Sequence, residues 1–146
     1  MGFGQAIKHV FSNYANFNGR ASRSEFWWWY LFVVLGGIII SIPLNIGLTS
    51  SLNTLQVNEA TNTVSGGGLS GLAIFGMIIA IAWSLALIIP TLAVGCRRLH
   101  DTDRSGWWWL LYYFCCIIGV IVVIIFWASP STPGPNRFGE GPATAA

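Results

Sequence analysis

The sequence predicts an all-α integral membrane protein with three transmembrane helices and an N-terminal amphipathic helix on the membrane surface. Charged residues make up only 8% of the chain and hydrophobic residues 54%, whereas about 25% of the residues in a soluble domain are charged. Three uncharged apolar runs lie at about residues 26–48, 69–94 and 107–127, and about 20 residues suffice to cross the bilayer core. A length of 146 residues fits one membrane domain over residues 1–146.

The N-terminal residues 3–18 carry apolar side chains at three- and four-residue steps, which places them on one face of a helix. These side chains are Phe3, Ile7, Val10, Phe11, Tyr14 and Phe17. Such a helix either lies flat on the membrane with its aromatic face in the lipid, or packs on the protein's own loops. We favour the membrane-surface helix.

The first span begins after a capping-box pattern, in which Ser22 and Glu25 satisfy each other's backbone N–H groups. Pro43 lies in its last turns and is expected to kink the helix without preventing insertion. Residues 49–68 are rich in Ser, Thr and Asn, end in three glycines and have Glu59 as their only charge. We interpret them as a flexible loop without a strand.

The second span, at about 69–94, has small residues every four positions at Gly76, Ala80 and Ser84, which allows a neighbouring helix to approach closely. The third span follows at about 107–127. The tail, 128–146, contains four prolines and is expected to be extended or disordered.

The orientation in the membrane follows from the positive residues. Lys8, Arg20 and Arg23 precede the first span, three arginines lie between the second and third spans, and Arg137 is alone in the tail. With three crossings, six positive residues therefore face one alone, which predicts a cytoplasmic N-terminus and a periplasmic C-terminus. Four tryptophans are the expected anchors at the cytoplasmic interface: Trp27, Trp28, Trp107 and Trp108.

This threading gathers a polar cluster at the cytoplasmic face. Its members are Arg20, Arg23, Glu25, Arg97, Arg98, His100, Asp101, Asp103 and Arg104. In the structural interpretation, which we favour, Glu25 pairs with Arg97 or Arg98, and Asp101 or Asp103 caps the third helix. In a second interpretation the arginines and His100 bind a lipid headgroup or another anion.

A third interpretation assigns catalysis or metal binding to His100 and Asp101. One histidine and two nearby acids are too few to define a metal site, and three cysteines form neither a disulfide framework nor a zinc pattern. We therefore predict no cofactor and no metal. The net charge of +2 is too small to argue for nucleic acid, and basic residues beside apolar runs suit anionic lipid headgroups better.

Three sequence blocks carry a family resemblance: residues 17–28 (FNGRASRSEFWW), residues 97–101 with 104–108 (RRLHD and RSGWW), and residues 134–139 (GPNRFG) followed by Pro142. With these blocks the chain resembles the YhaH/YhaI-type family of small bacterial inner-membrane proteins, a domain of unknown function. The resemblance implies a multi-helix protein of the inner membrane and no established reaction, substrate or cofactor. A motif within the tail also implies that residues 136–139 are ordered against the outer mouth of the bundle.

These observations predict a non-enzymatic, multi-pass inner-membrane component. It would bind lipid headgroups or a partner protein through its arginine-rich cytoplasmic face, and a homo-oligomer or a partner membrane protein is compatible with the sequence. One alternative is a small-solute transporter or channel, which would need an oligomer because three helices enclose little pore. The other is a lipid-modifying enzyme that uses His100 and Asp101.

Overall fold

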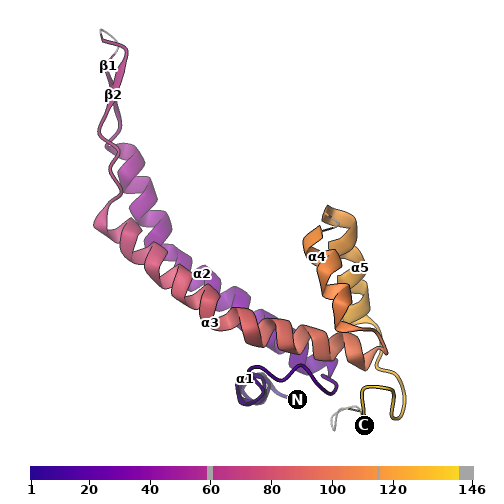
Figure 1. Cartoon of the computed structure of the whole chain (residues 1–146). Helices are drawn as coiled ribbons and strands as arrows, with labels where there is room; N and C mark the ends of the chain where they lie inside the picture. The colour runs from indigo at the N-terminus through magenta and orange to yellow at the C-terminus, as the bar shows by residue number, and fades with distance from the viewer. Residues whose placement is uncertain (59–60, 115, 142–146) are drawn as a thin grey trace. The chain divides into compact units, whose positions relative to one another are not determined.

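In the computed structural model, residues 1–58, 61–114 and 116–141 are described. Their helices are α1 (Phe3–Ser12), α2 (Arg23–Asn53), α3 (Gly71–Asp101), the short 3₁₀ helix η1 (Gly106–Trp108), α4 (Trp109–Phe114) and α5 (Cys116–Ala128) (Figure 1). The contacts within the chain divide it into two compact units, residues 1–32 with 87–146 and residues 33–86. The predicted helical fold is confirmed.

Two of the helices, α2 and α3, are long and apolar enough to cross a membrane. Each has 31 residues, or about 46 Å at 1.5 Å per residue, against a hydrocarbon core of about 30 Å. Both continue beyond the predicted spans, α2 to Asn53 and α3 to Asp101. Hydropathy locates the apolar stretch and not the helix end, so the polar last turns escaped the prediction.

In the unit of residues 33–86, the backbones of α2 and α3 approach closely at glycines. A Cβ atom on Gly47 would overlap the backbone nitrogen of Ala73, and one on Gly76 would overlap that of Leu44. The close approach predicted at Gly76 is therefore confirmed. Pro43 lies inside α2 without ending it.

The connection between α2 and α3 contains a small β-hairpin, which corrects the expectation of a loop without a strand. Strand β1 (Gln56–Asn58) pairs antiparallel with β2 (Thr63–Ser65). Asn62 turns the chain at a positive φ of 50°, a conformation that asparagine tolerates. Strands of three residues show no usable hydropathy alternation. Glu59 lies outside the described residues.

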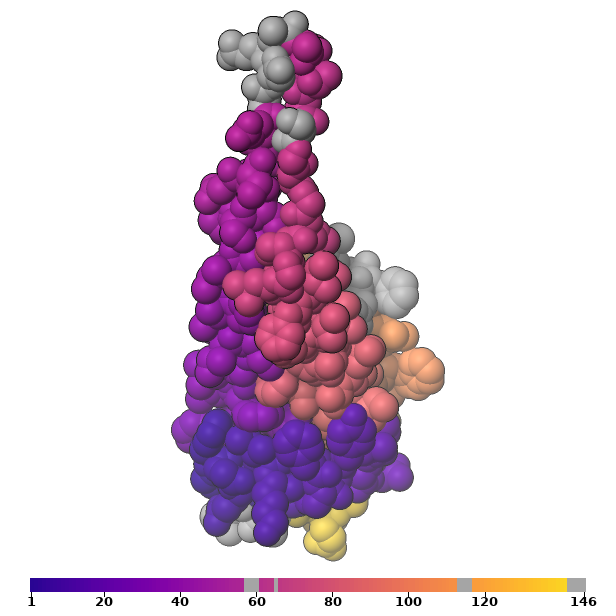
Figure 2. Space-filling model, turned by 90° about the vertical axis from the view of Figure 1, so that its left-hand side faces the viewer, coloured from indigo at the N-terminus to yellow at the C-terminus, as the bar shows by residue number. Residues whose placement is uncertain are grey.

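Helix α1 packs on the protein itself through Ala6 and Val10, both of which are buried. The Phe3 ring lies edge-on to Trp28 at 5.7 Å between ring centres. Figure 2 shows the N-terminal atoms (indigo) against the lower ends of α2 and α3. These contacts match the alternative of a helix packed on the protein, and placement on the membrane surface stays a prediction. The helix ends at Ser12 instead of 18, because the Ser12 and Asn13 side chains donate to its last carbonyls.

The predicted third span at 107–127 is wrong as a single helix. The Trp108 and Phe126 rings are 5.3 Å apart and the Trp109 and Trp127 rings 4.8 Å. In a continuous helix the two tryptophans of the second pair would be about 27 Å apart. Helices α4 and α5 therefore form a helical hairpin (Figure 1), with Cys115 between them outside the described residues. Hydropathy alone cannot distinguish one apolar helix from two shorter helices that fold back on each other.

Candidate functional site

A buried carboxylate, Asp101, closes the end of α3. It is fully buried and accepts hydrogen bonds from Arg20 Nε at 2.9 Å, from Arg98 Nη1 and from the hydroxyl of Ser131. The four side chains come from the segment before α2, from α3 and from the tail. One carboxylate thus joins three segments that are far apart in the sequence.

The two arginines use further N–H groups on backbone carbonyls in the last turn of α5 and after it. Arg20 Nη1 and Nη2 donate to the carbonyls of Gly134 and Thr132, both at 2.6 Å. Arg98 Nε donates to the carbonyl of Trp127 at 2.8 Å, and its Nη2 donates to that of Ser129. We call residues 20–25, 97–104 and 129–138 the polar cap. Buried arginines paired in this way are stabilised by carboxylate and carbonyl together.

The prediction that Asp101 or Asp103 caps the third helix is wrong. At the start of η1 the hydroxyl of Ser105 accepts from the backbone N–H of Trp107 at 3.4 Å. The Asp101 carboxylate instead accepts hydrogen bonds from Arg20 and Arg98. Asp103 lies in the turn after α3 with a positive φ of 56°. A helix cap can be predicted from neighbouring residues alone. The partners of Asp101 include Arg20 and Ser131, which are far from it in the sequence.

The tail is ordered over residues 136–139, as predicted, but against the end of α3 at His100 and not against the outer mouth of the bundle. Asn136 Nδ2 donates to the carbonyl of His100 at 2.9 Å, and Asn136 and Gly139 exchange backbone hydrogen bonds of 3.0 and 2.9 Å. The Phe138 ring stacks on His100 with 3.9 Å between ring centres. Pro142 and the residues after it lie outside the described part of the chain.

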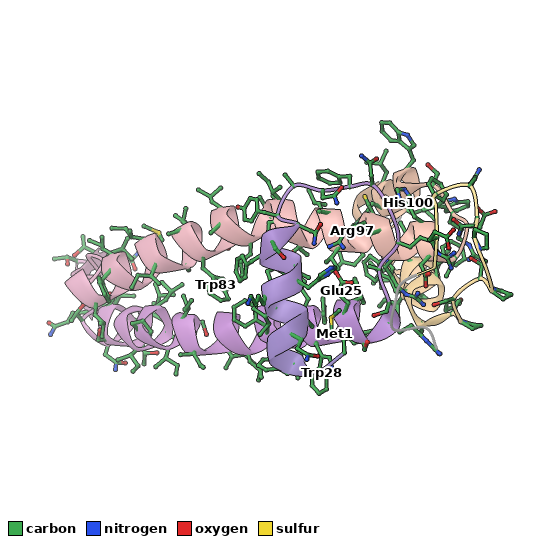
Figure 3. All side chains as sticks on the ribbon, turned by 90° about the horizontal axis from the view of Figure 1, so that it is seen from below. Met1, Glu25, Trp28, Trp83, Arg97 and His100 are labelled. Carbon is green, nitrogen blue, oxygen red and sulfur yellow. The ribbon has the colours of Figure 1, made fainter. Side chains whose placement is uncertain are left out.

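The second buried carboxylate, Glu25, ties α1, α2 and α3 together. Its Oε1 lies 3.0 Å from Arg97 Nη1 and 3.0 Å from His9 Nδ1, and Figure 3 shows Glu25 and Arg97 beside α1. Of the two predicted partners, Arg97 is correct and Arg98 is not. Ser22 caps α2 by accepting from the Glu25 N–H at 3.2 Å. The Glu25 side chain was expected to accept from the backbone N–H of Ser22, and it pairs with Arg97 instead.

We expect Glu25→Gln and Arg97→Gln each to lower the stability of the protein in detergent, and the double variant to lose less than their sum. A buried pair of this kind has a coupling energy of about 0.5–3 kcal/mol, because each single variant strands the other charge. Denaturation curves of the four proteins measure it, with Arg23→Gln as a variant outside the pair. Additive losses would contradict the pairing.

The other predicted cluster members lie at the edge of the cap. Arg23 is exposed, and Arg104 lies over the Phe126 ring, 4.0 Å from its centre. Asp103 pairs at 3.2 Å with Arg137, and both side chains are largely exposed. Sequence reasoning missed Arg137 and the tail as partners. Their signal was the GPNRFG block, which we placed on the opposite side of the membrane.

His100 is a packed side chain in this site. Its ring stacks on Phe138, and its Nδ1 lies 3.3 Å from the Gly19 carbonyl oxygen. None of its hydrogen bonds among the described residues goes to the Asp101 carboxylate. The described residues also contain no group of histidine, cysteine and acidic side chains that could hold a metal ion.

The predicted anchors Trp27, Trp28, Trp107 and Trp108 all have exposed rings. Trp29, Trp109 and Trp127 are buried instead, and Trp127 donates to the Gly95 carbonyl at 3.3 Å. The two runs of three tryptophans, 27–29 and 107–109, therefore each contain two exposed residues and one buried residue.

Residues 14–140 match the model of a family described as Protein of unknown function (DUF805). The chain belongs to this family. Inner membrane protein YhaI of Escherichia coli (strain K12) is 35% identical over 134 residues, which are 91% of each chain. Inner membrane protein YhaH of the same strain is 36% identical over 133 residues, 91% of this chain and 92% of the relative. No solved structure matches.

The predicted membership in a YhaH/YhaI-type family of inner-membrane proteins is thereby confirmed. The DUF805 match begins after α1 and ends at residue 140. It therefore includes every segment of the polar cap, among them Arg20, Asp101 and Asn136. Helix α1 precedes the match, so its His9 is a partner of Glu25 that DUF805 does not cover.

Proposed function

We propose that this DUF805 protein is a non-enzymatic inner-membrane component that binds anionic lipid headgroups with its cytoplasmic cap. In this proposal α2 and α3 cross the bilayer, while the α4–α5 hairpin enters from the cytoplasmic side and returns to it. Helix α4 has 6 residues and α5 has 13, and apolar helices of 10–14 residues suit re-entrant segments better than spans. Both ends of the hairpin meet the cap. Its first end directly follows residues 97–104 in the chain, and at its second end the carbonyl of Trp127 accepts from Arg98 Nε at 2.8 Å.

The positive residues support two crossings over three. With two crossings, all seven Lys and Arg residues lie on one side and the α2–α3 connection on the other side has none. Three crossings would leave Arg137 apart from the other six, although it pairs with Asp103. The positive-inside rule therefore favours a cytoplasmic C-terminus, in place of the periplasmic one expected from the sequence.

Labelling of single cysteines in the full chain tests this topology. With the three native cysteines replaced by alanine, Thr61→Cys is expected to react with a membrane-impermeant maleimide in intact spheroplasts. Glu140→Cys is expected to react only after permeabilisation, as is Lys8→Cys, the internal control. Reaction of Glu140→Cys in intact spheroplasts would contradict two crossings and support three.

The headgroup proposal rests on the positive charge left over at the cap and on α1 beside it. Leaving aside Glu59, the chain has seven Lys and Arg against four Asp and Glu residues. Ion pairs include Arg20, Arg97, Arg98 and Arg137, and among the described residues none includes Lys8, Arg23 or Arg104. Arg104 is half-buried, whereas Lys8 and Arg23 are exposed, and a basic residue near an anionic membrane surface contributes about 1 kcal/mol. The exposed, unpaired charges of Lys8 and Arg23 are the observation that carries the proposal.

Titration of the detergent-solubilised protein with short-chain phosphatidylglycerol and phosphatidylcholine, read by native mass spectrometry, tests the function. We expect a preference for phosphatidylglycerol that falls about 30-fold in the double variant Lys8→Gln/Arg23→Gln, from about 2 kcal/mol of lost attraction. Arg137→Gln, whose charge is already paired, should keep the preference. An equal preference in all three proteins would refute headgroup binding by these residues.

The contacts favour neither alternative function. Asp101, the acid of the catalytic alternative, already accepts from three side chains. For the transporter alternative, the polar side chains of Ser41, Asn45 and Ser84 in residues 33–86 donate to carbonyls of their own helices.

A further inference from the structure

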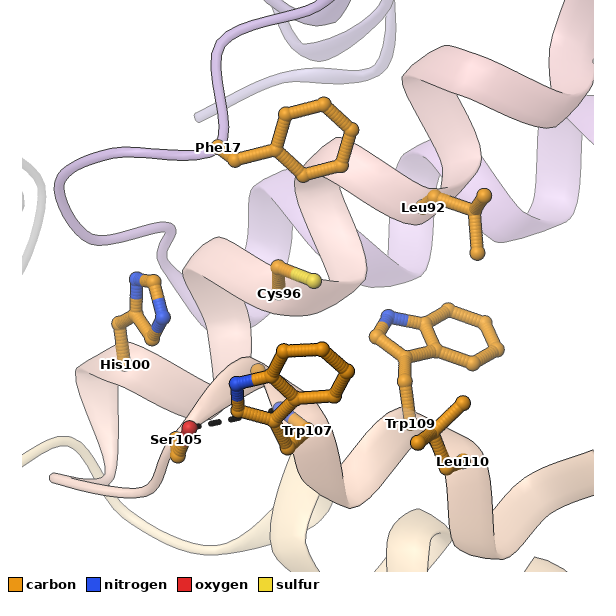
Figure 4. A pocket seen from close by; sticks show the side chains of 9 residues that line it. Phe17, Leu92, Cys96, His100, Ser105, Trp107, Trp109 and Leu110 are labelled. Carbon is orange, nitrogen blue, oxygen red and sulfur yellow. Dashed lines mark hydrogen bonds between the residues drawn. The ribbon is translucent and has the colours of Figure 1, made fainter.

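An open pocket of about 440 Å³ lies where the end of α3 meets η1 and α4 (Figure 4). Its volume falls within the range of about 300–1,000 Å³ that is usual for small-molecule sites. Leu92, Cys96 and His100 form the α3 wall, and Trp107, Trp109 and Leu110 face it. All of the lining residues belong to the unit of residues 1–32 and 87–146.

The pocket has an apolar end and a polar end. Leu92, Cys96 and His100 follow one another at four-residue steps, so they share a helix face and span about 12 Å along it. Leu92 belongs to the apolar stretch of α3, whereas His100 and Ser105 lie at the cap end. The pocket wall therefore changes from apolar side chains to hydrogen-bonding groups along its length. This change matches the boundary between the acyl chain and the headgroup of a lipid.

We propose that this pocket binds one phospholipid, with an acyl chain between Leu92 and Leu110 and the phosphate near His100 and Ser105. Trp107 beside it is 77% exposed, and tryptophan prefers the depth of the headgroup boundary. One positive residue, Arg104, directly precedes Ser105 at the polar end. Its charge complements a phosphate, which a plain hydrocarbon ligand lacks. The inference rests on the membrane placement proposed above.

Cys96 forms part of the pocket wall on α3. Its thiol is half-buried and packs as a small apolar side chain. Gly106 faces it, because a Cβ atom there would lie 3.0 Å from Cys96 Sγ. A larger residue at either position would reduce the space for an acyl chain.

Native mass spectrometry of the full chain in detergent, with dioleoyl phosphatidylglycerol or dioleoyl phosphatidylcholine added, tests the proposal. We expect one phospholipid to be retained per protein, and its occupancy to fall at least fivefold in Leu92→Trp, which fills the apolar end. Ile125→Trp makes a comparable change at an exposed position of α5 outside the pocket and should leave the occupancy unchanged. Equal occupancy in Leu92→Trp and the unaltered protein overturns the site, as does retention of many lipids without a preferred number.

A second measurement covers the case in which Leu92→Trp fails to fold. Phosphatidylglycerol with a photoreactive group at the end of its acyl chain should crosslink the unaltered protein mainly between residues 92 and 96 and at Leu110. Crosslinks spread over the exposed apolar residues of α2 would show bulk lipid only and overturn the proposal. Lys8→Gln/Arg23→Gln separates the two proposals, because it should lose headgroup preference while still retaining the single lipid.

Discussion

Asp101→Asn is expected to destabilise the protein by about 3–5 kcal/mol, the cost of removing one partner from a buried charge network. The substitution leaves two buried guanidinium groups, those of Arg20 and Arg98, without their shared negative charge. It also weakens the acceptor for the hydroxyl of Ser131. Chemical denaturation in detergent, followed by tryptophan fluorescence, measures the loss. Hydrogen exchange should rise together in residues 20–25 and 129–138, because both segments are held through this carboxylate.

Asp103→Asn is the matched control. It removes the same charge two residues further along the chain, but its ion pair with Arg137 has side chains that are 48% and 60% exposed. Exposed pairs contribute about 0–1 kcal/mol, so the denaturation midpoint should barely move. Similar losses in both variants would mean that Asp101 is not the centre of the cap.

Gly47→Ala is expected to destabilise the pairing of α2 with α3 by about 1–3 kcal/mol, the usual cost of overpacking. The added methyl group would overlap the Ala73 backbone, which cannot rotate away as a side chain can. Gly37→Ala should have the opposite sign, because its new methyl group meets nothing within 4 Å and alanine is favoured over glycine inside a helix by about 0.5–1 kcal/mol. Unfolding titrations in mixed detergent micelles compare the two variants. Stabilisation by both would show that the backbones are further apart at Gly47 than described.

The elements that could be predicted are those that depend on neighbouring residues or on the overall hydropathy of a segment. The apolar runs of α2 and α3 need no partner to be recognised, because only a bilayer accommodates that many uncharged residues. The pairing of Glu25 with Arg97 was within reach because both lie just outside an apolar run on the same side. Hairpin formation in residues 106–128 was not predictable, since the aromatic contacts of Trp108 and Trp109 depend on three-dimensional packing that hydropathy does not encode.

The predicted cluster lacked several of the partners that its buried members have in the structure. Arg20 and Arg98 were assigned to headgroups as an alternative, yet both donate to Asp101 and to carbonyls in the last turn of α5 or after it. Those carbonyls carry no sequence signal of their own. The expectation of three crossings placed the tail on the side opposite to the cluster and so removed its acceptors from consideration. Buried arginines without enough acidic partners nearby were the clue, because such groups need additional acceptors.

The closing of the cap by the tail has a consequence for synthesis. The hydroxyl of Ser131 and the carbonyls of Thr132 and Gly134 bind side chains that were translated much earlier. Until the ribosome has released these acceptors, Arg20 and Asp101 cannot complete their bonds, however early α2 and α3 enter the lipid. Final assembly is therefore a late step, and nascent chains halted before residue 134 should be preferred targets of membrane proteases.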